Sequence, residues 1–425
     1  MILGHTIALD PTAKQEEYFR KACGVARFAY NWGLAEWKRQ HGAGEKPSAN
    51  KLKKQWNAVR RQDFPWSLEV TKCASGQAIM NLGTAFSNFF SDLKKPKKDR
   101  HFRYPKFKKR GVKDSFALWN DQFAISGKRI RVPNLGWVRM REALRFDGKI
   151  MGAVVSHNAG RWFVSIQVDV AQAITEHERP GSVVGVDLGI ATLLTLSRPL
   201  DDGRVKIDNP KPRRAYMKRQ KRLQRRISRQ ELLRRKTAAK KSRRQIKRQA
   251  QLQILHYRVA CIRKDAIHKA TSALARQFET IVLEDLNVSG MAKNHSLAGS
   301  ILDASFGEIR RQAEYKTKLT GGHVEIADRF FASSKICSEC GCIADKMPLH
   351  VRTWTCPHCG SVHDRDENAS KNLEFIVVGQ AMPEPPQDDL AATHGEILAL
   401  AAPKGAVKLR SVNRELNPCS LLSTN

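Results

Sequence analysis

The sequence predicts a multidomain α/β protein, and three observations support this fold class. Residues 115–170 alternate apolar and polar side chains in short runs separated by Gly, Pro and Asn, which is typical of a small β-barrel or sandwich. Two apolar runs, 182–197 and 280–286, have the composition of buried strands, and a helical pattern lies between them. A chain of 425 residues exceeds one typical domain, so we expect two to four domains.

The first quarter of the chain predicts a short strand followed by helices. Residues 6–9 form the expected strand, and Thr12 and Gln15 after it have the spacing of a helix capping box. A second helical stretch covers about 68–93. Both helical stretches carry several large aromatic side chains, so neither is expected to be a lone solvated helix.

The chain carries a large excess of positive charge, with 75 Lys and Arg against 41 Asp and Glu and a formal net charge of +34. Two segments concentrate it: 94–113 has eleven Lys and Arg, and 211–250 has nineteen with one acidic residue. A solvated helix face accounts for much of 211–250. Like charges at helical spacing nevertheless repel one another, and phosphate contacts would relieve that repulsion. The composition therefore indicates a polyanionic partner.

Three aromatic residues, Phe102, Tyr104 and Phe107, interleave with the basic residues of 94–113. Exposed rings between cations are suited to stacking on unpaired bases. Large aromatic side chains are more often buried, however, so we expect these three to pack in the core.

The second half of the chain predicts a sheet covered by helices. Residues 182–189 and 191–197 are expected to form adjacent buried strands joined by a tight turn. Residues 252–278 have one apolar stripe at helical spacing. Residues 305–319 predict another helix, and 323–327 predict another strand.

Two Cys-x-x-Cys pairs, fifteen residues apart, predict one structural zinc site. The pairs are Cys337 with Cys340 and Cys356 with Cys359. This spacing is that of a four-cysteine zinc ribbon, in which each pair turns two thiolates toward one Zn²⁺. Cys342, beside the first pair, is a competing ligand.

Three acidic positions are candidates for a catalytic site. Asp187 lies inside a predicted strand, where an unpaired carboxylate is costly to bury. Glu284 and Asp285 end another strand, and alternation allows only one of them to join Asp187. Asp366 begins a predicted helix.

Each of these acids alone also has a structural explanation: Asp187 as a turn cap, Glu284 as the partner of a core arginine, and Asp366 as a helix N-cap. Together they match a site that cleaves phosphodiesters with two metal ions, in which several carboxylates converge from different elements. Oxygen ligands of this kind favour two Mg²⁺ ions, with Mn²⁺ as the alternative.

The order of these motifs resembles the TnpB family, transposon-encoded proteins that are compact relatives of type V CRISPR effectors. The motifs that carry the resemblance are 28–34, 104–109, 135–138, 185–189, 283–286, the two cysteine pairs and 363–369. The resemblance covers roughly 1–378 and implies an RNase H-like (RuvC) nuclease fold. Asp187, Glu284 and Asp366 would form its magnesium-binding catalytic triad, and the family pattern selects Asp366 over Asp364.

The resemblance also implies a division of the chain. An amino-terminal β-barrel (wedge) domain, 1–12 and 115–180, would hold an inserted helical recognition domain with a basic linker, 13–114. The RuvC-like nuclease would comprise 181–335 and 364–380, with the zinc ribbon, 336–363, inserted in it. Residues 381–425, which are rich in Pro, Ala and Asp, are expected to be a disordered tail.

The function that the resemblance implies is an RNA-guided DNA endonuclease of an insertion sequence, cutting beside a short adjacent motif. Its partners would be a guide RNA from the transposon end and double-stranded target DNA, bound by a monomer. A nuclease-silent RNA-guided repressor and an accessory transposition protein that joins DNA ends are the alternatives.

The expected location is the prokaryotic cytoplasm, in association with the nucleoid. No apolar run approaches the roughly 20 residues of a membrane-spanning helix, and the first ten residues carry no basic leader of a signal peptide. The cysteines outside the two pairs are scattered, which is typical of a reducing compartment.

Overall fold

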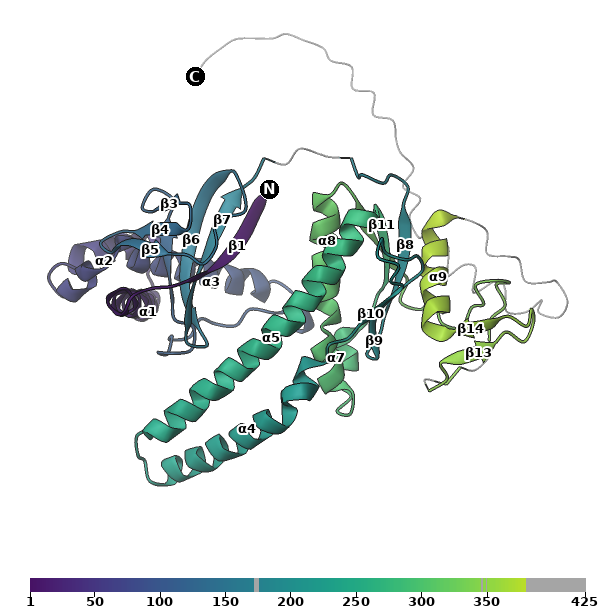
Figure 1. Cartoon of the computed structure of the whole chain (residues 1–425). Helices are drawn as coiled ribbons and strands as arrows, with labels where there is room; N and C mark the ends of the chain where they lie inside the picture. Colours follow the sequence, from purple (N-terminus) through teal and green to yellow (C-terminus); the bar gives the residue numbers. More distant parts are fainter. Residues whose placement is uncertain (172–175, 345–346, 349, 380–425) are drawn as a thin grey trace, which may run out of the picture. The chain divides into compact units, whose positions relative to one another are not determined.

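The computed structural model describes residues 1–171, 176–344, 347–348 and 350–379. These residues form two compact units (Figure 1). The first comprises the chain up to residue 171 together with Arg213–Cys261, and the second comprises 176–212 and all described residues from Ile262 onward. The predicted tail, 381–425, lies outside the described residues.

The first unit contains three helices on its amino-terminal side: α1 (Ala13–Gly42), α2 (Ala49–Val59) and α3 (Lys72–Leu93). The capping box before α1 is confirmed, since Thr12 Oγ1 accepts from the Gln15 amide and Gln15 Oε1 accepts from the Thr12 amide. The stretch 68–93 begins with a 3₁₀ turn, Pro65–Glu69, so the α-helix starts later than expected. Helix α2 was not predicted, because only Leu52 and Trp56 anchor its short, polar sequence.

Two antiparallel sheets complete the first unit, which confirms the strand pattern of 115–170. One has the order β1-β7-β6-β2 and is made of β1 (Ile2–Leu9), β7 (Arg161–Asp169), β6 (Lys149–Asn158) and β2 (Ser115–Trp119). The other is made of β3 (Ala124–Ser126), β4 (Arg129–Val132) and β5 (Gly136–Arg139). A bridge between Leu9 and Met140 joins them, and one apolar core runs through the helices and both sheets.

The basic segment 211–250 forms two long helices, α4 (Pro212–Lys236) and α5 (Arg243–Gln277). Helix α5 begins well before the predicted start at 252. Its first turns are rich in Lys, Arg and Gln and lack the apolar stripe that predicts the rest of the helix. Glu231 ties the two helices together: it pairs with Arg234 on α4 and accepts from Gln245 on α5 at 2.9 Å. No described helix combines the length and the apolar composition that crossing a membrane requires.

The second unit is built on a mixed five-stranded sheet of order β10-β9-β8-β11-β12 (Figure 1). Its strands are β8 (Val183–Leu188), β9 (Thr192–Leu196), β10 (Lys206–Asp208), β11 (Thr280–Glu284) and β12 (His323–Ala327). Strands β8, β11 and β12 are parallel, and β9 and β10 are antiparallel additions. The helices that follow are α6 (Val288–Met291), α7 (Ala298–Ala304), α8 (Phe306–Leu319) and α9 (Arg365–Val378).

The two faces of this sheet pack against different helices. One face buries Val184, Val186, Ile281 and Leu283 in a core shared with α7, α8 and the second half of α5. On the other face, Val183 and Val282 contact Leu373 of α9. Residues 183, 185 and 187 of β8 therefore share the face that α9 covers.

Gly185 allows α9 to approach β8 unusually closely. A Cβ atom built on Gly185 would overlap the carbonyl oxygen of Ser370 and lie 2.6 Å from the Glu374 amide nitrogen. Backbone atoms cannot move aside as a flexible side chain can, so a side chain at this position would push the helix away. The position of α9 on the sheet depends on this glycine.

We predict that Gly185→Ala destabilises the second unit by about 1–3 kcal/mol, because the added methyl group overpacks a backbone contact. Hydrogen exchange of β8 and α9 would rise in the variant. Gly4→Ala is the matched control: Gly4 also lies in a strand, but a Cβ atom added there would have no neighbour within 4 Å. Equal exchange in both variants would contradict the assigned role of Gly185.

Candidate acidic site and metal centre

Asp187 and Glu284 lie at the ends of two neighbouring parallel strands. The register pairs Val282 with Gly185 and Leu283 with Val186, so the next residues of the two strands are Glu284 and Asp187. Both side chains lie on the face that α9 covers, and both are partly buried. Two strands thus bring together two acids that are far apart in the sequence.

Asp285 faces the other way, as strand alternation predicts. Its carboxylate pairs with Arg310 of α8 at 3.1 Å and with Arg329 at 2.5 Å. Two arginines thus neutralise Asp285, and of the two neighbouring acids only Glu284 shares a face with Asp187.

Helix α9 carries two acids at its start, and they have different environments. Asp364 is the N-cap: its Oδ1 accepts from the amides of Asp366 and Glu367 at 2.9 and 3.1 Å. Asp364 also pairs with Lys206 of β10 at 2.9 Å. The N-cap explanation considered for Asp366 is therefore wrong, because Asp364 has that role. Asp366 lies in the first turn of the helix and contacts Arg352 at 3.2 Å.

The electrostatics of Asp187 show that Glu284 and Asp366 act on this carboxyl group. Burial, followed by the charges of Glu284 and Asp366, raises the pKa of Asp187 to about 8. Each of the other two carboxylates also has a polar neighbour, since Glu284 accepts from the Ser333 hydroxyl and Asp366 contacts Arg352. The arrangement concentrates negative charge at one end of the sheet, which is the kind of oxygen-rich site that binds a divalent cation.

The four cysteines form a compact group that could hold a metal ion. Among the described residues they are the only group of three or more such ligands whose donor atoms all lie within 4.8 Å of one another. The three carboxylates are thus farther apart than the thiols. The Sγ atoms of Cys337 and Cys359 are 3.7 Å apart, and those of Cys340 and Cys356 are 3.6 Å apart. Four thiols this close fit a tetrahedral Zn²⁺ and leave no open position for water.

Each cysteine pair lies in a tight turn, as the spacing predicts. The Gly341 amide donates to the Cys337 carbonyl, and the Gly360 amide donates to the Cys356 carbonyl. Both glycines have positive φ, 73° and 72°. The second turn joins two short strands, β13 (Thr353–Thr355) and β14 (Val362–Asp364).

His363 is a residue that the sequence reasoning missed. It is buried against Trp354, and its Nε2 lies 3.1 Å from Cys337 Sγ. A ring N–H donated to a metal thiolate orients that ligand and stabilises its negative charge. A histidine next to Asp364 was visible in the sequence, but nothing there placed it against the first cysteine pair.

Two asparagines of α9 attach the cysteine site to the acidic site. Asn368 donates to the Ile336 carbonyl at 2.6 Å and accepts from the Ser338 amide at 2.9 Å. Asn372 donates to the carbonyls of Ser333 and Ile336 at 2.7 Å each. The backbone on both sides of Cys337 is therefore held by the helix whose first turn carries Asp366.

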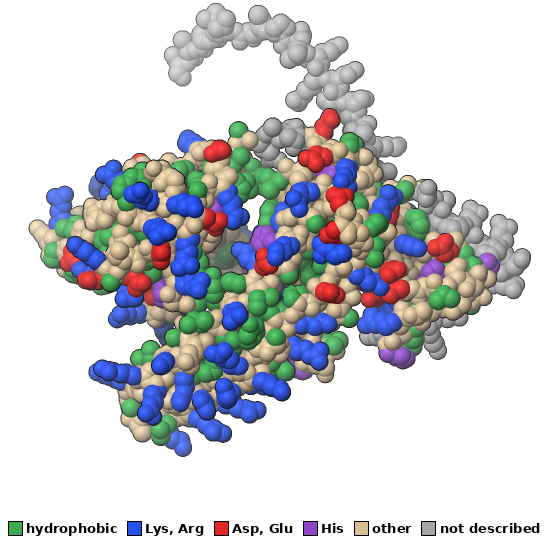
Figure 2. Space-filling view, in the orientation of Figure 1, with side chains coloured by type: hydrophobic (Ala, Val, Ile, Leu, Met, Phe, Trp, Pro, Cys, Tyr) green, Lys and Arg blue, Asp and Glu red, His purple; other side chains and the backbone are tan. Residues whose placement is uncertain are grey.

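The basic segments lie on the surface of the first unit. Figure 2 shows Lys and Arg side chains gathered over α4 and the start of α5. The prediction that the aromatic residues of 94–113 pack in the core is wrong: Phe102, Tyr104 and Phe107 are 51%, 43% and 51% exposed.

Three family profiles match different parts of the chain. Residues 164–295 match OrfB_IS605, described as "Probable transposase", and residues 306–373 match a "Cas12f1-like, TNB domain". Residues 1–46 match the "Helix-turn-helix domain" associated with OrfB_IS605. In this chain that segment is occupied by β1 and the long helix α1.

Relatives match the chain over most of its length. A protein of Streptomyces pristinaespiralis named "Putative RNA-guided DNA endonuclease" is 33% identical over 85% of this chain and 86% of its own. The Escherichia coli K12 protein "Putative RNA-guided DNA endonuclease InsQ" is 31% identical over 91% of this chain and 97% of its own. Among solved structures, a Cas12f1–sgRNA–target DNA complex has a similar fold, with a TM-score of 0.50, 15% identity, and 85% of this chain and 83% of the Cas12f1 chain covered.

We predict that Cys356→Ser abolishes stoichiometric zinc binding and lowers the yield of folded protein, because zinc affinity at such sites is folding free energy. Hydrogen exchange at the start of α9 would rise as well, since Asn368 and Asn372 hold the first cysteine pair. Cys342→Ser is the matched control, because Cys342 lies outside the four-thiol group. Loss of zinc in the Cys342 variant with retention in the Cys356 variant would overturn the ligand assignment.

We predict that Asp187→Asn stabilises the protein in the absence of divalent ions. The folded-state pKa of Asp187 is raised from 3.8 to about 8, so the wild type loses stability as pH rises through this window, while the variant does not. Thermal unfolding of both proteins, measured from about pH 4 to above pH 8, would show a difference that grows with pH. Asp265→Asn, at an exposed residue of α5, serves as the control. A stability difference that stays constant with pH would refute the prediction.

Proposed function

The chain belongs to the TnpB family, and on that premise we propose that it is an RNA-guided DNA endonuclease that cleaves target DNA beside a short adjacent motif. The observation that supports the proposal is the acidic site: Asp187 and Glu284 lie on neighbouring strands, and the charges of Glu284 and Asp366 raise the pKa of Asp187. The names of the relatives support the RNA guide and the DNA target.

We assign the magnesium-binding role to these three acids. Mutual repulsion among carboxylates is the expected consequence of a site built for cations, and their oxygen donors suit Mg²⁺. Bound in a pair, Mg²⁺ ions would activate the attacking water and neutralise charge on the leaving oxygen.

The protein's own residues set the geometry of this site. Strands β8 and β11 fix Asp187 and Glu284 side by side, and the contact at Gly185 fixes the helix that carries Asp366. Arg352 holds Asp366 by an ion pair that a cation would compete with.

The domains that we propose for this chain are those that the resemblance to the TnpB family implies. The five-stranded sheet with its helices would be the RuvC-like nuclease, and the cysteine-bearing segment would be a zinc ribbon inserted in it. The sheets of the first unit would form the wedge domain, with α1 to α3 as the recognition domain. A guide RNA from the transposon end and double-stranded target DNA would be the partners.

The proposal is tested by purifying the protein with its native locus, sequencing the bound RNA, and challenging the complex with a plasmid library that carries a guide-matched target and a randomised flank. We expect a bound RNA and Mg²⁺-dependent cuts next to a common flank. Binding without cutting would favour the nuclease-silent alternative, and joined ends would favour the transposition alternative.

We predict that Asp366→Asn lowers the cleavage rate about 100-fold or more. Substituting a residue that only supports a metal ligand typically lowers metal affinity or activity 10- to 100-fold, and a direct ligand should matter at least as much. Asp364→Asn should stay within about tenfold of the wild type, because Asn is an equally good N-cap. Both variants should bind guide RNA like the wild type. The reverse order of cleavage rates would assign the metal to Asp364.

A further inference from the structure

An aromatic and cationic surface lies on the first unit, whereas the acidic site belongs to the second. Four aromatic side chains on α3 and the segment after it are between 43% and 51% exposed: Phe90, Phe102, Tyr104 and Phe107. Single exposed aromatic residues are common on protein surfaces. Four within eighteen residues, in and beside a segment with eleven Lys and Arg, are typical of an interaction site.

The segment that carries Phe102, Tyr104 and Phe107 is held in place at both ends. Asp92 at the end of α3 is buried and accepts hydrogen bonds from the amides of His101 and Phe102, while Lys95 pairs with its other oxygen at 2.9 Å. Farther along, Asn31 of α1 both donates to and accepts from the Lys108 backbone, at 3.0 and 2.8 Å. Between these anchors Pro105 is buried, and the residues around it face solvent.

Cations lie directly beside the rings. Lys38 Nζ is 5.7 Å from the centre of the Tyr104 ring and 5.1 Å from that of Phe107. Tyr104 also meets Phe86 and Phe89 edge-on, so its ring is held in place while the residue stays 43% exposed. Fixed rings lose little conformational freedom when a planar ligand stacks on them.

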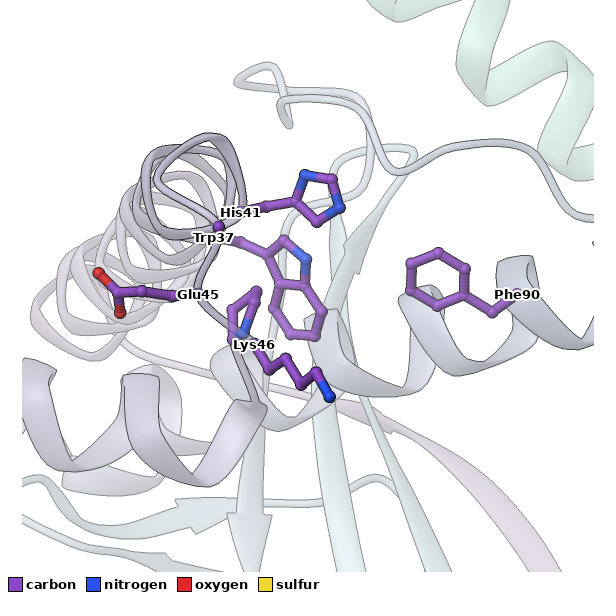
Figure 3. Close-up of a pocket in the computed structure, with 7 residues that line it drawn as sticks. Trp37, His41, Glu45, Lys46 and Phe90 are labelled. Carbon is purple, nitrogen blue, oxygen red and sulfur yellow. The ribbon is translucent and has the colours of Figure 1, made fainter.

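A pocket continues this surface at the end of α1. Its volume is about 360 Å³, and its lining includes Trp37, His41, Lys46 and Phe90. Figure 3 shows Phe90 facing the Trp37 side of the pocket, His41 and Lys46 near the Trp37 ring, and the Glu45 carboxylate directed away from both aromatic rings. The Trp37 indole is itself stacked on buried Phe86, with ring centres 4.0 Å apart.

We propose that this surface, defined as Phe90, Phe102, Tyr104 and Phe107 with Lys38 and Lys46, binds unpaired nucleotides of an RNA. Planar rings stack on bases of any sequence, and the flanking cations neutralise phosphates. Bases inside duplex DNA are already stacked, whereas a folded RNA presents loops and ends whose bases are free. The inference rests on the proposed function for the presence of an RNA, but not on cleavage.

The test measures binding of the full chain to a labelled oligouridylate of about 12 nucleotides, a length within the range of such sites, without added Mg²⁺. The double variant Phe102→Leu with Phe107→Leu keeps apolar bulk and removes two rings. We expect its affinity to fall roughly tenfold or more, with an unchanged salt dependence because no charge is lost. Replacing the same residues by Tyr should restore binding.

Trp137→Leu is the matched control, because Trp137 is equally exposed at 44% but lies on β5, outside the surface. Equal losses in the control and the double variant, or no loss in the double variant, would overturn the proposal. Tighter binding of an oligodeoxythymidylate than of the oligouridylate, with the same sensitivity to the Leu substitutions, would also overturn it, by assigning the surface to DNA. A protein that binds as expected yet cuts no DNA would refute the endonuclease function and leave this surface intact.

Discussion

The acidic site depends on one close contact between a strand and a helix. Gly185 lets the backbone of α9 approach β8 so closely that no side chain fits between them. Asp187 lies two residues farther along the same face of the strand, and Asp366 lies one helical turn before Ser370, the residue whose carbonyl meets Gly185. The contact therefore sets the spacing of two acids that belong to distant parts of the sequence.

The cysteine site supports this contact from the other side of the helix. Asn368 and Asn372 hold the backbone around Cys337, so a bound metal would restrain α9 as well as the ribbon. Both asparagine side chains form hydrogen bonds with backbone groups next to Cys337. Residues outside the cysteine pairs thus help to position the metal ligands. In this arrangement the cysteine-bearing segment supports the five-stranded sheet through α9.

Features that depend on neighbouring residues alone, such as turns and the faces of strands, could be predicted from the sequence. Cysteine spacing predicted the two turns, and alternation separated Glu284 from Asp285 before any fold was known. Choices that depend on distant partners were harder. Asp364 and Asp366 look alike in the sequence, and only the hydrogen bonds of the helix start reveal the cap. The usual burial of large aromatic residues predicts Phe102 and its neighbours inside. The hydrogen bonds of Asp92 and Asn31, which hold their segment at the surface, leave no recognisable signal in the sequence.

The packing of α9 also limits how a chain of this kind can vary in length. Inserting or deleting one residue between Asp366 and Ser370 would turn the acid by about 100° around the helix while Gly185 kept the rest of the helix in place. Such a change would carry the carboxylate away from Asp187 without unfolding anything. Length differences among functional homologues should therefore be absent from these five positions.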